Sequence, residues 1–167
     1  MKKTFQIFFD AILLFIVAGI VCYLTTFVAS LFGIELKEQR AFEYIKNLRG
    51  LRLLILVAYA LILAPIIEEF VFRYLLFRLP QKLCSLFKIV AGKNITVLLA
   101  IISSILFTAV HYLGKGAFPD NAFVGLFAVG MYQCRLYDKR KSLARAMLNH
   151  SLFNTLNLAV FYLVEVL

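Results

Sequence analysis

The chain has no tryptophan, three prolines, three cysteines and two histidines among 167 residues, and only 16% of its residues are charged. With 63% hydrophobic residues and a mean hydropathy of +0.90, this scarcity of charge excludes an ordinary soluble domain. Cys22, Cys84 and Cys134 have no CxxC or CxxH spacing, which excludes a zinc knuckle and a disulfide framework. Acidic residues are also few, 9 against 18 Lys and Arg. We expect the excess positive charge to lie in loops near anionic lipid and not to bind nucleic acid.

Long apolar runs dominate what is present. Five of them predict membrane spans: Phe5–Phe32, Leu53–Leu79, Ile95–Leu113, Ala122–Tyr137 and Ala146–Val166. The first run is too long for the apolar region of a signal peptide, so we expect a retained span. Each span takes about 20 residues, which leaves too few for a folded domain on either side. We therefore predict that residues 1–167 form a single all-α domain, a polytopic integral membrane helical bundle of about five transmembrane helices.

Loop composition predicts how the bundle lies in the membrane. The N-terminus, the second loop and the fourth loop carry most of the Lys and Arg residues, so these segments are predicted to be cytoplasmic. The short, basic chain, without room for a further folded domain, suggests a bacterial plasma membrane. After Pro80, apolar residues recur with helical spacing at Leu83, Leu86, Phe87 and Val90. This pattern predicts a short interfacial helix in the second loop.

Ionisable residues within the spans are informative because a charge at mid-bilayer costs about 2.5–3.5 kcal/mol. Glu68, Glu69 and Arg73 lie in the second span, His111 near the end of the third and His150 in the fifth. Glu69 and Arg73 are i, i+4 neighbours, which predicts an ion pair. Glu68 points about 100° away from Glu69, so the same arginine cannot satisfy both carboxylates. Glu68 is therefore the carboxylate that Arg73 is not expected to pair with.

Two polar stripes accompany the charges. His150 and Asn154 share one helix face, and a stripe of serine and threonine ends at His111. Either stripe alone is typical of hydrogen-bonded helix packing. Together with Glu68, the histidines allow two chemistries: a zinc ion with a bound water, or Glu68 acting directly as a general base on water. No HExxH motif supports zinc, and neither Ser104 nor Ser151 has the partners of a serine nucleophile.

The depths of these residues predict an uneven site. With about 1.5 Å per residue, Glu68 lies roughly 16 Å and His150 roughly 12 Å from the cytoplasmic ends of their spans. His111 lies roughly 24 Å from the corresponding end. We therefore expect that a tilt, a kink at Pro65 or a late entry of the third span is needed to bring the three together.

Three motifs follow one another along the chain: Glu68-Glu69-x-x-x-Arg73, Phe107-x-x-x-His111 and His150-x-x-x-Asn154. In this order on three helices they resemble the signatures of the CPBP family. That family comprises the CAAX prenyl endopeptidases of the Rce1 type and the bacterial Abi proteins linked to bacteriocin processing and self-immunity. Ala64-Pro65 and Ser142-Leu143 also resemble the family. The resemblance covers residues 53–158, the motif-bearing core.

The resemblance implies an intramembrane endopeptidase in which six residues form the site. Glu68 would activate the hydrolytic water and His111 would help to hold it, His150 and Asn154 would stabilise the oxyanion, and Glu69 with Arg73 would brace the site. It implies no cofactor, with zinc as the alternative. The implied partners are membrane lipid and a membrane-associated peptide or protein substrate.

Two functions of other classes stay open at this point. A non-catalytic immunity protein would bind a peptide toxin in the polar cavity and would tolerate an isosteric change at Glu68. A small transporter could relay protons through buried Glu and His, although the absence of an inverted repeat in the sequence disfavours it.

Overall fold

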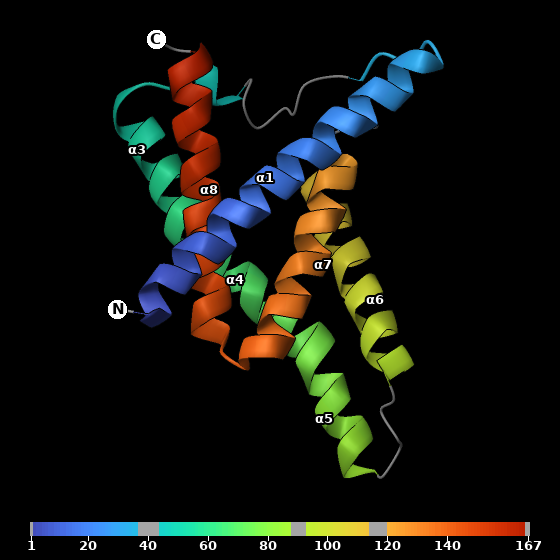
Figure 1. Cartoon of the computed structure of the whole chain (residues 1–167). Helices are drawn as coiled ribbons and strands as arrows, with labels where there is room; N and C mark the ends of the chain where they lie inside the picture. The colour runs from blue at the N-terminus through green and yellow to red at the C-terminus, as the bar shows by residue number, and fades with distance from the viewer. Residues whose placement is uncertain (1, 37–43, 88–92, 114–119, 166–167) are drawn as a thin grey trace.

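The structure, a computed structural model, describes residues 2–36, 44–87, 93–113 and 120–165. In these ranges the chain forms helices and no strand (Figure 1). All five predicted spans coincide with helices: α1 (Lys2–Leu31), a run from Gly50 to Leu86, α6 (Lys93–Tyr112), α7 (Phe123–Arg140) and α8 (Leu143–Glu165). The first three are long and apolar enough to cross a membrane. The prediction of an all-α membrane bundle is confirmed; Val90 and Val166, which it included, lie outside the described residues.

The second helical run is continuous over 37 residues but changes its hydrogen-bond pattern along its length. Its segments are α3 (Gly50–Ala58), η1 (Tyr59–Leu63), α4 (Ala64–Glu68), η2 (Glu69–Arg78) and α5 (Leu79–Leu86). The two η segments are π-helical, with bonds from residue i to i+5, a geometry that is rare and often found at functional sites. The stretch after Pro80 is helical as predicted, and it continues η2 without a break.

This continuity bears on the depths that the sequence predicts for Glu68 and His111. The sequence interpretation ended the second span before Pro80, whereas the helix runs on to Leu86. Eighteen residues separate Glu68 from Leu86, and eighteen separate Lys93 from His111. The α6 helix returns antiparallel to the run that ends in α5 (Figure 1), and Glu68 Oε1 lies 3.8 Å from His111 Nε2.

The helices pack so that the motif-bearing segments meet in the middle. The α1 helix crosses α7 and α8 and contacts both (Figure 1), α6 packs on α7 and η2, and α8 packs on η1, α4 and η2. Leu14, Phe72, Phe107 and Val129 share one buried cluster contributed by α1, η2, α6 and α7. At Gly130, an added Cβ would lie 2.8 Å from the Ser104 Cβ, so glycine is required for the close approach of α6 and α7.

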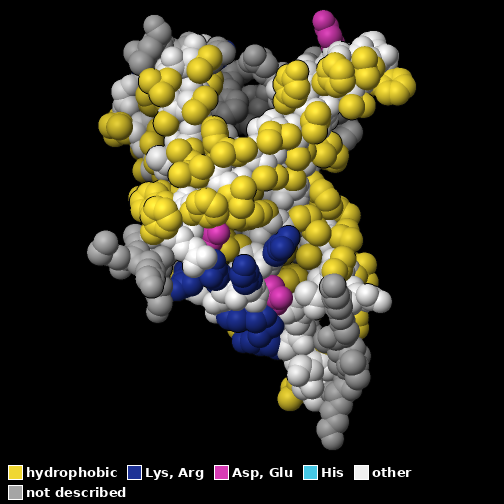
Figure 2. Space-filling view, in the orientation of Figure 1, with side chains coloured by type: hydrophobic (Ala, Val, Ile, Leu, Met, Phe, Trp, Pro, Cys, Tyr) yellow, Lys and Arg dark blue, Asp and Glu magenta, His cyan; other side chains and the backbone are white. Residues whose placement is uncertain are grey.

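The outer surface is that of a membrane protein. Hydrophobic side chains form a broad band across the face shown in Figure 2, and Lys and Arg side chains gather below it. Large apolar residues of α1 such as Phe8, Ile12 and Ile16 are about half exposed, at 48–51%. Exposed apolar side chains on a helix of this length are expected to face lipid.

Candidate active site

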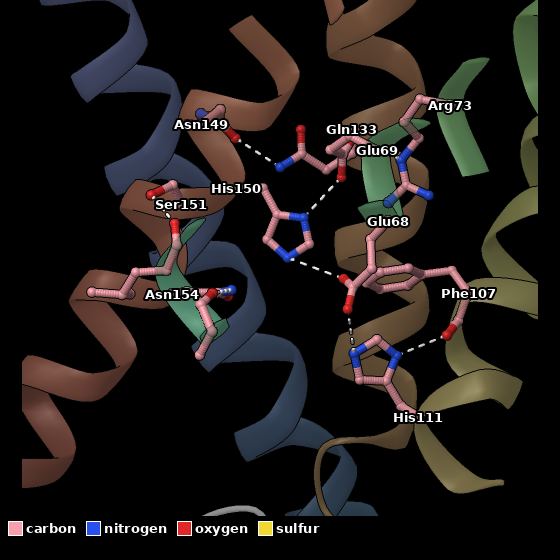
Figure 3. A network of polar contacts seen from close by, with 12 residues as sticks. Glu68, Glu69, Arg73, Phe107, His111, Gln133, Asn149, His150, Ser151 and Asn154 are labelled. Atoms are coloured by element: carbon pink, nitrogen blue, oxygen red, sulfur yellow. Dashed lines mark hydrogen bonds and ion pairs between the residues drawn. The ribbon is translucent and has the colours of Figure 1, made fainter. Parts of the chain in front are cut away.

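The carboxylate of Glu68 lies between the two histidines of the chain (Figure 3). Glu68 ends α4, and its Oε1 is 3.8 Å from Nε2 of His111 on α6. Its Oε2 is 3.6 Å from Nε2 of His150 on α8. Both distances exceed a direct hydrogen bond. The three residues that the sequence singled out therefore come together from three helices.

The three side chains differ in their access to the outside. The His150 side chain is 4% exposed, whereas those of Glu68 and His111 are 22% and 25% exposed. The site is thus buried at His150 and partly open at Glu68 and His111. A substrate can approach the carboxylate without entering a closed cavity.

Hydrogen bonds at the Nδ1 atom of each histidine fix the orientation of its ring relative to Glu68. His150 Nδ1 is 2.9 Å from Glu69 Oε1, and His111 Nδ1 is 2.8 Å from the carbonyl oxygen of Phe107. An ionised carboxylate and a carbonyl only accept hydrogen bonds, so both Nδ1 atoms carry a proton and donate it. This assigns the tautomer from the hydrogen-bond network and directs the Nε2 atom of each ring at Glu68.

Glu69 and Arg73 form the predicted ion pair. Glu69 Oε2 lies 3.3 Å from Arg73 Nε, and both side chains are fully buried. The guanidinium also lies over the Phe107 ring, 4.7 Å from its centroid, a cation–π contact. Glu69 contacts both Arg73 and His150. The Glu69 carboxylate therefore links the Arg73 guanidinium to the His150 ring, which faces Glu68.

Pro65 determines how α8 is attached to the helix that carries Glu68. Proline has no backbone N–H. Another residue at this position would donate its N–H to the carbonyl of Leu61, four residues earlier, or to that of Ala60, five residues earlier. Ser151 Oγ donates to the Leu61 oxygen at 2.6 Å, and Asn154 Nδ2 donates to the Ala60 oxygen at 2.8 Å. Side chains of a neighbouring helix commonly satisfy carbonyls released by a membrane proline.

The hydrogen bond of Asn154 to the Ala60 carbonyl was not predicted from the sequence. The sequence paired Asn154 with His150 at the oxyanion, whereas its amide here ties α8 to η1. The oxyanion role stays a prediction, and the observed bond makes Asn154 a positioning residue as well. The contact of Ser151 with the Leu61 carbonyl was also not predicted. The missing N–H of Pro65 could have indicated that this carbonyl needs a donor from another helix.

We expect Ser151→Ala to destabilise the protein by about 1 kcal/mol, because the partly buried Leu61 carbonyl loses its donor. In a Pro65→Ala background the same change is expected to cost less than half as much, since the introduced alanine supplies an N–H to that carbonyl. Thermal unfolding in detergent of the two single variants and the double variant measures this coupling. Thr155→Ala is the matched control, because Thr155 is exposed and bonds only within α8. Equal costs in both backgrounds would contradict the link to Pro65.

A second buried polar pair lies beside the site. Gln133 on α7 donates from Nε2 to Asn149 Oδ1 at 3.0 Å, and both side chains are fully buried. Asn149 immediately precedes His150, so the pair connects α7 to the histidine-bearing turn of α8 (Figure 3). This pair could not be predicted from the sequence, because the spacing of residues within one helix does not show which residues of two helices meet.

Zinc was the alternative chemistry for the same side chains. Two Nε2 atoms and a carboxylate are donors that zinc accepts. However, the part of the chain that the structure describes contains no group of three or more His, Cys, Asp or Glu side chains arranged to hold a metal ion. The described residues therefore give no geometry for a zinc-dependent mechanism. Sensitivity of cleavage to a chelator tests that alternative.

Comparison with protein-family models identifies a family that the chain resembles. A family model described as type II CAAX prenyl endopeptidase Rce1-like matches residues 50–156, which is more than half of the chain and includes Glu68, Glu69, Arg73, His111, His150 and Asn154. No curated protein and no solved structure matches the chain.

Proposed function

The chain belongs to the type II CAAX prenyl endopeptidase Rce1-like family, and from this premise we propose that it is an intramembrane endopeptidase in which Glu68 activates water. The observation that carries the proposal is the position of the Glu68 carboxylate, 3.6–3.8 Å from the Nε2 atoms of two histidines on other helices. An ionisable group in this position within a bundle is a functional site by default.

The geometry supports general-base catalysis. Two atoms 3.8 Å apart can both lie at hydrogen-bond distance, about 2.8 Å, from a third atom between them. A water in that position donates one hydrogen to Glu68 and the other to His111 Nε2, whose lone pair is free because Nδ1 holds the ring proton. Glu68 then takes the proton as the water oxygen attacks the peptide carbonyl. The protonated Glu68 can next deliver this proton to the leaving amine.

We infer that His150 responds to the charge that forms on the peptide oxygen. Its Nδ1 is held by Glu69, which is in turn held by Arg73. A hydrogen bond donated by the ring toward the site would stabilise the developing oxyanion. Removal of one such donor typically costs about 10²–10³ in rate. Glu69 and Arg73 act through His150, as positioning residues.

The proposed substrate is a peptide or protein that already lies at the membrane, because the site belongs to helices that face lipid. Processing of bacteriocin-like peptides, or self-immunity through such cleavage, is one biological role within this proposal. A membrane-partitioning peptide, with or without a prenyl group, is the appropriate probe. Membrane lipid is the other proposed partner.

Replacement of His111 tests the proposed water-holding role. We expect His111→Ala to lower kcat by about 10²–10³-fold with a much smaller change in KM, since the side chain contacts the water and not the body of the substrate. Its loss should change thermal stability little, because among the described residues its side chain hydrogen-bonds only to a carbonyl of its own helix. Steady-state cleavage of a fluorogenic membrane-partitioning peptide measures both constants.

Val110→Ala is the matched control for His111→Ala, because Val110 is the preceding residue on α6 and is 49% exposed. The control should cleave at the wild-type rate. Normal cleavage by purified His111→Ala would remove His111 from the mechanism. Loss of wild-type activity to a chelator, with recovery on adding zinc, would show instead that a metal acts at the site.

A further inference from the structure

A small crevice opens where α7 ends and α8 begins. It lies between the N-terminal part of α1, the end of α7 and the first turns of α8. Its polar lining consists of Gln6, Asp10, Arg140, Arg145 and Asn149. The chain reverses here through Lys141, which adopts a left-handed conformation with φ of 51°.

One charge in the crevice is unbalanced. Asp10 Oδ2 lies 3.5 Å from Arg140 Nη2, so these two side chains offset one another. In the part of the chain that the structure describes, the Arg145 side chain has no ion pair or hydrogen bond; only its backbone N–H is bonded, to Ser142 Oγ. The crevice therefore carries one net positive charge, at Arg145.

Asn149 adds an unused donor to the same crevice. Its side chain is fully buried, and its Oδ1 accepts the hydrogen bond from Gln133. Its Nδ2 has no hydrogen-bond partner among the described residues and points away from Gln133 (Figure 3). A buried donor without a partner is unusual and requires an explanation. An acceptor bound in the crevice would supply one.

The remaining features of the crevice also favour an anion. It lies beside the N-terminal turns of α8, a helix of 23 residues whose dipole places positive charge at that end. Lys and Arg side chains gather around this junction, directly below the hydrophobic band, in Figure 2. This is the level at which lipid headgroups meet a membrane protein, and basic pockets between helices are typical sites for anionic headgroups.

We propose that the phosphate group of an anionic membrane phospholipid binds at the mouth of the crevice, on the Arg145 guanidinium, and that a water within the crevice links it to the buried Asn149 amide. The acyl chains of that lipid would lie along the apolar side of α1, where Ile7 lines the crevice and Phe8 is exposed. The water would connect the bound headgroup to the residue next to His150. The site is separate from Glu68, so it does not depend on the proteolytic function.

Native mass spectrometry of the full chain purified in detergent tests the site. The protein is exposed to phosphatidylglycerol or phosphatidylcholine, and retained lipid is counted. We expect one phosphatidylglycerol to be retained in preference to phosphatidylcholine. Arg145→Gln is expected to weaken this retention by about tenfold, because a charge-assisted hydrogen bond is lost. Lys139→Gln is the matched control, since it removes the same charge from an exposed residue of α7 outside the crevice.

The remaining outcomes separate the possible sources of the anion. Equal losses in Arg145→Gln and Lys139→Gln would overturn the proposal and leave only general surface charge. Displacement of phosphatidylglycerol by inorganic phosphate at millimolar concentration would overturn the lipid assignment in favour of a soluble anion. Displacement by a peptide with a free C-terminal carboxylate would overturn it in favour of substrate. Resistance to both competitors supports a lipid site.

Discussion

Substitution of Glu68 by glutamine is expected to lower peptide cleavage by about 10²–10⁴-fold, the usual contribution of a general base. Glutamine keeps the size of the side chain but cannot take a proton from water. The fold should tolerate it, because no ion-pair distance at Glu68 is shorter than 3.6 Å and the side chain is 22% exposed. Cleavage rates of purified protein, together with thermal unfolding in detergent, measure the two effects separately.

Glu35→Gln is the matched control for this change, since Glu35 is an exposed carboxylate outside the helices. It should cleave and unfold as the wild type does. Wild-type cleavage by Glu68→Gln would show that the carboxylate is not the base. If the chain protects cells from a peptide toxin and Glu68→Gln protects equally well, the non-catalytic immunity protein becomes the better description.

Disruption of the buried Glu69–Arg73 pair is expected to have the largest effect on stability. Arg73→Met leaves the Glu69 carboxylate without its counter-charge at a fully buried position. Loss of one partner of a buried pair typically costs about 3–5 kcal/mol. The variant should accumulate poorly and unfold at a much lower temperature. Measurement of the melting temperature in detergent, with the yield of membrane-inserted protein, gives the size of the effect.

The double variant Glu69→Leu with Arg73→Met separates stability from catalysis. Replacement of both charges removes the unpaired carboxylate, so much of the lost stability should return. Cleavage should stay low, because His150 Nδ1 has lost its acceptor. The exposed surface pair Asp138–Lys141 provides the control, whose removal should change stability by less than about 1 kcal/mol. A double variant with normal cleavage would show that Glu69 does not position His150.

The fold could be predicted from the sequence because the bilayer imposes its own length scale on apolar helices. The ion pair of Glu69 and Arg73 was equally accessible, since i, i+4 spacing places both side chains on one helix face. The same geometry predicted that Arg73 pairs with Glu69 and not with Glu68. These predictions depend only on neighbours within one helix, and the structure confirms the helices and the pair.

Features that involve two helices were not predictable in the same way. The depth estimate took the second span to end before Pro80, whereas the helix continues to Leu86. The bond of Asn154 to the η1 backbone depends on where α8 packs, which no spacing within α8 specifies. The Gln133–Asn149 pair joins α7 to α8 for the same reason.

Cleavage of a fluorogenic, membrane-partitioning peptide library, with prenylated and unprenylated members, tests the central claim most directly. Wild type and Glu68→Gln are purified in detergent, confirmed to be folded, and assayed side by side with and without a chelator. The account predicts cleavage by wild type that ignores the chelator and disappears in Glu68→Gln. Cleavage that persists in Glu68→Gln, or that stops with the chelator and returns with zinc, would contradict it.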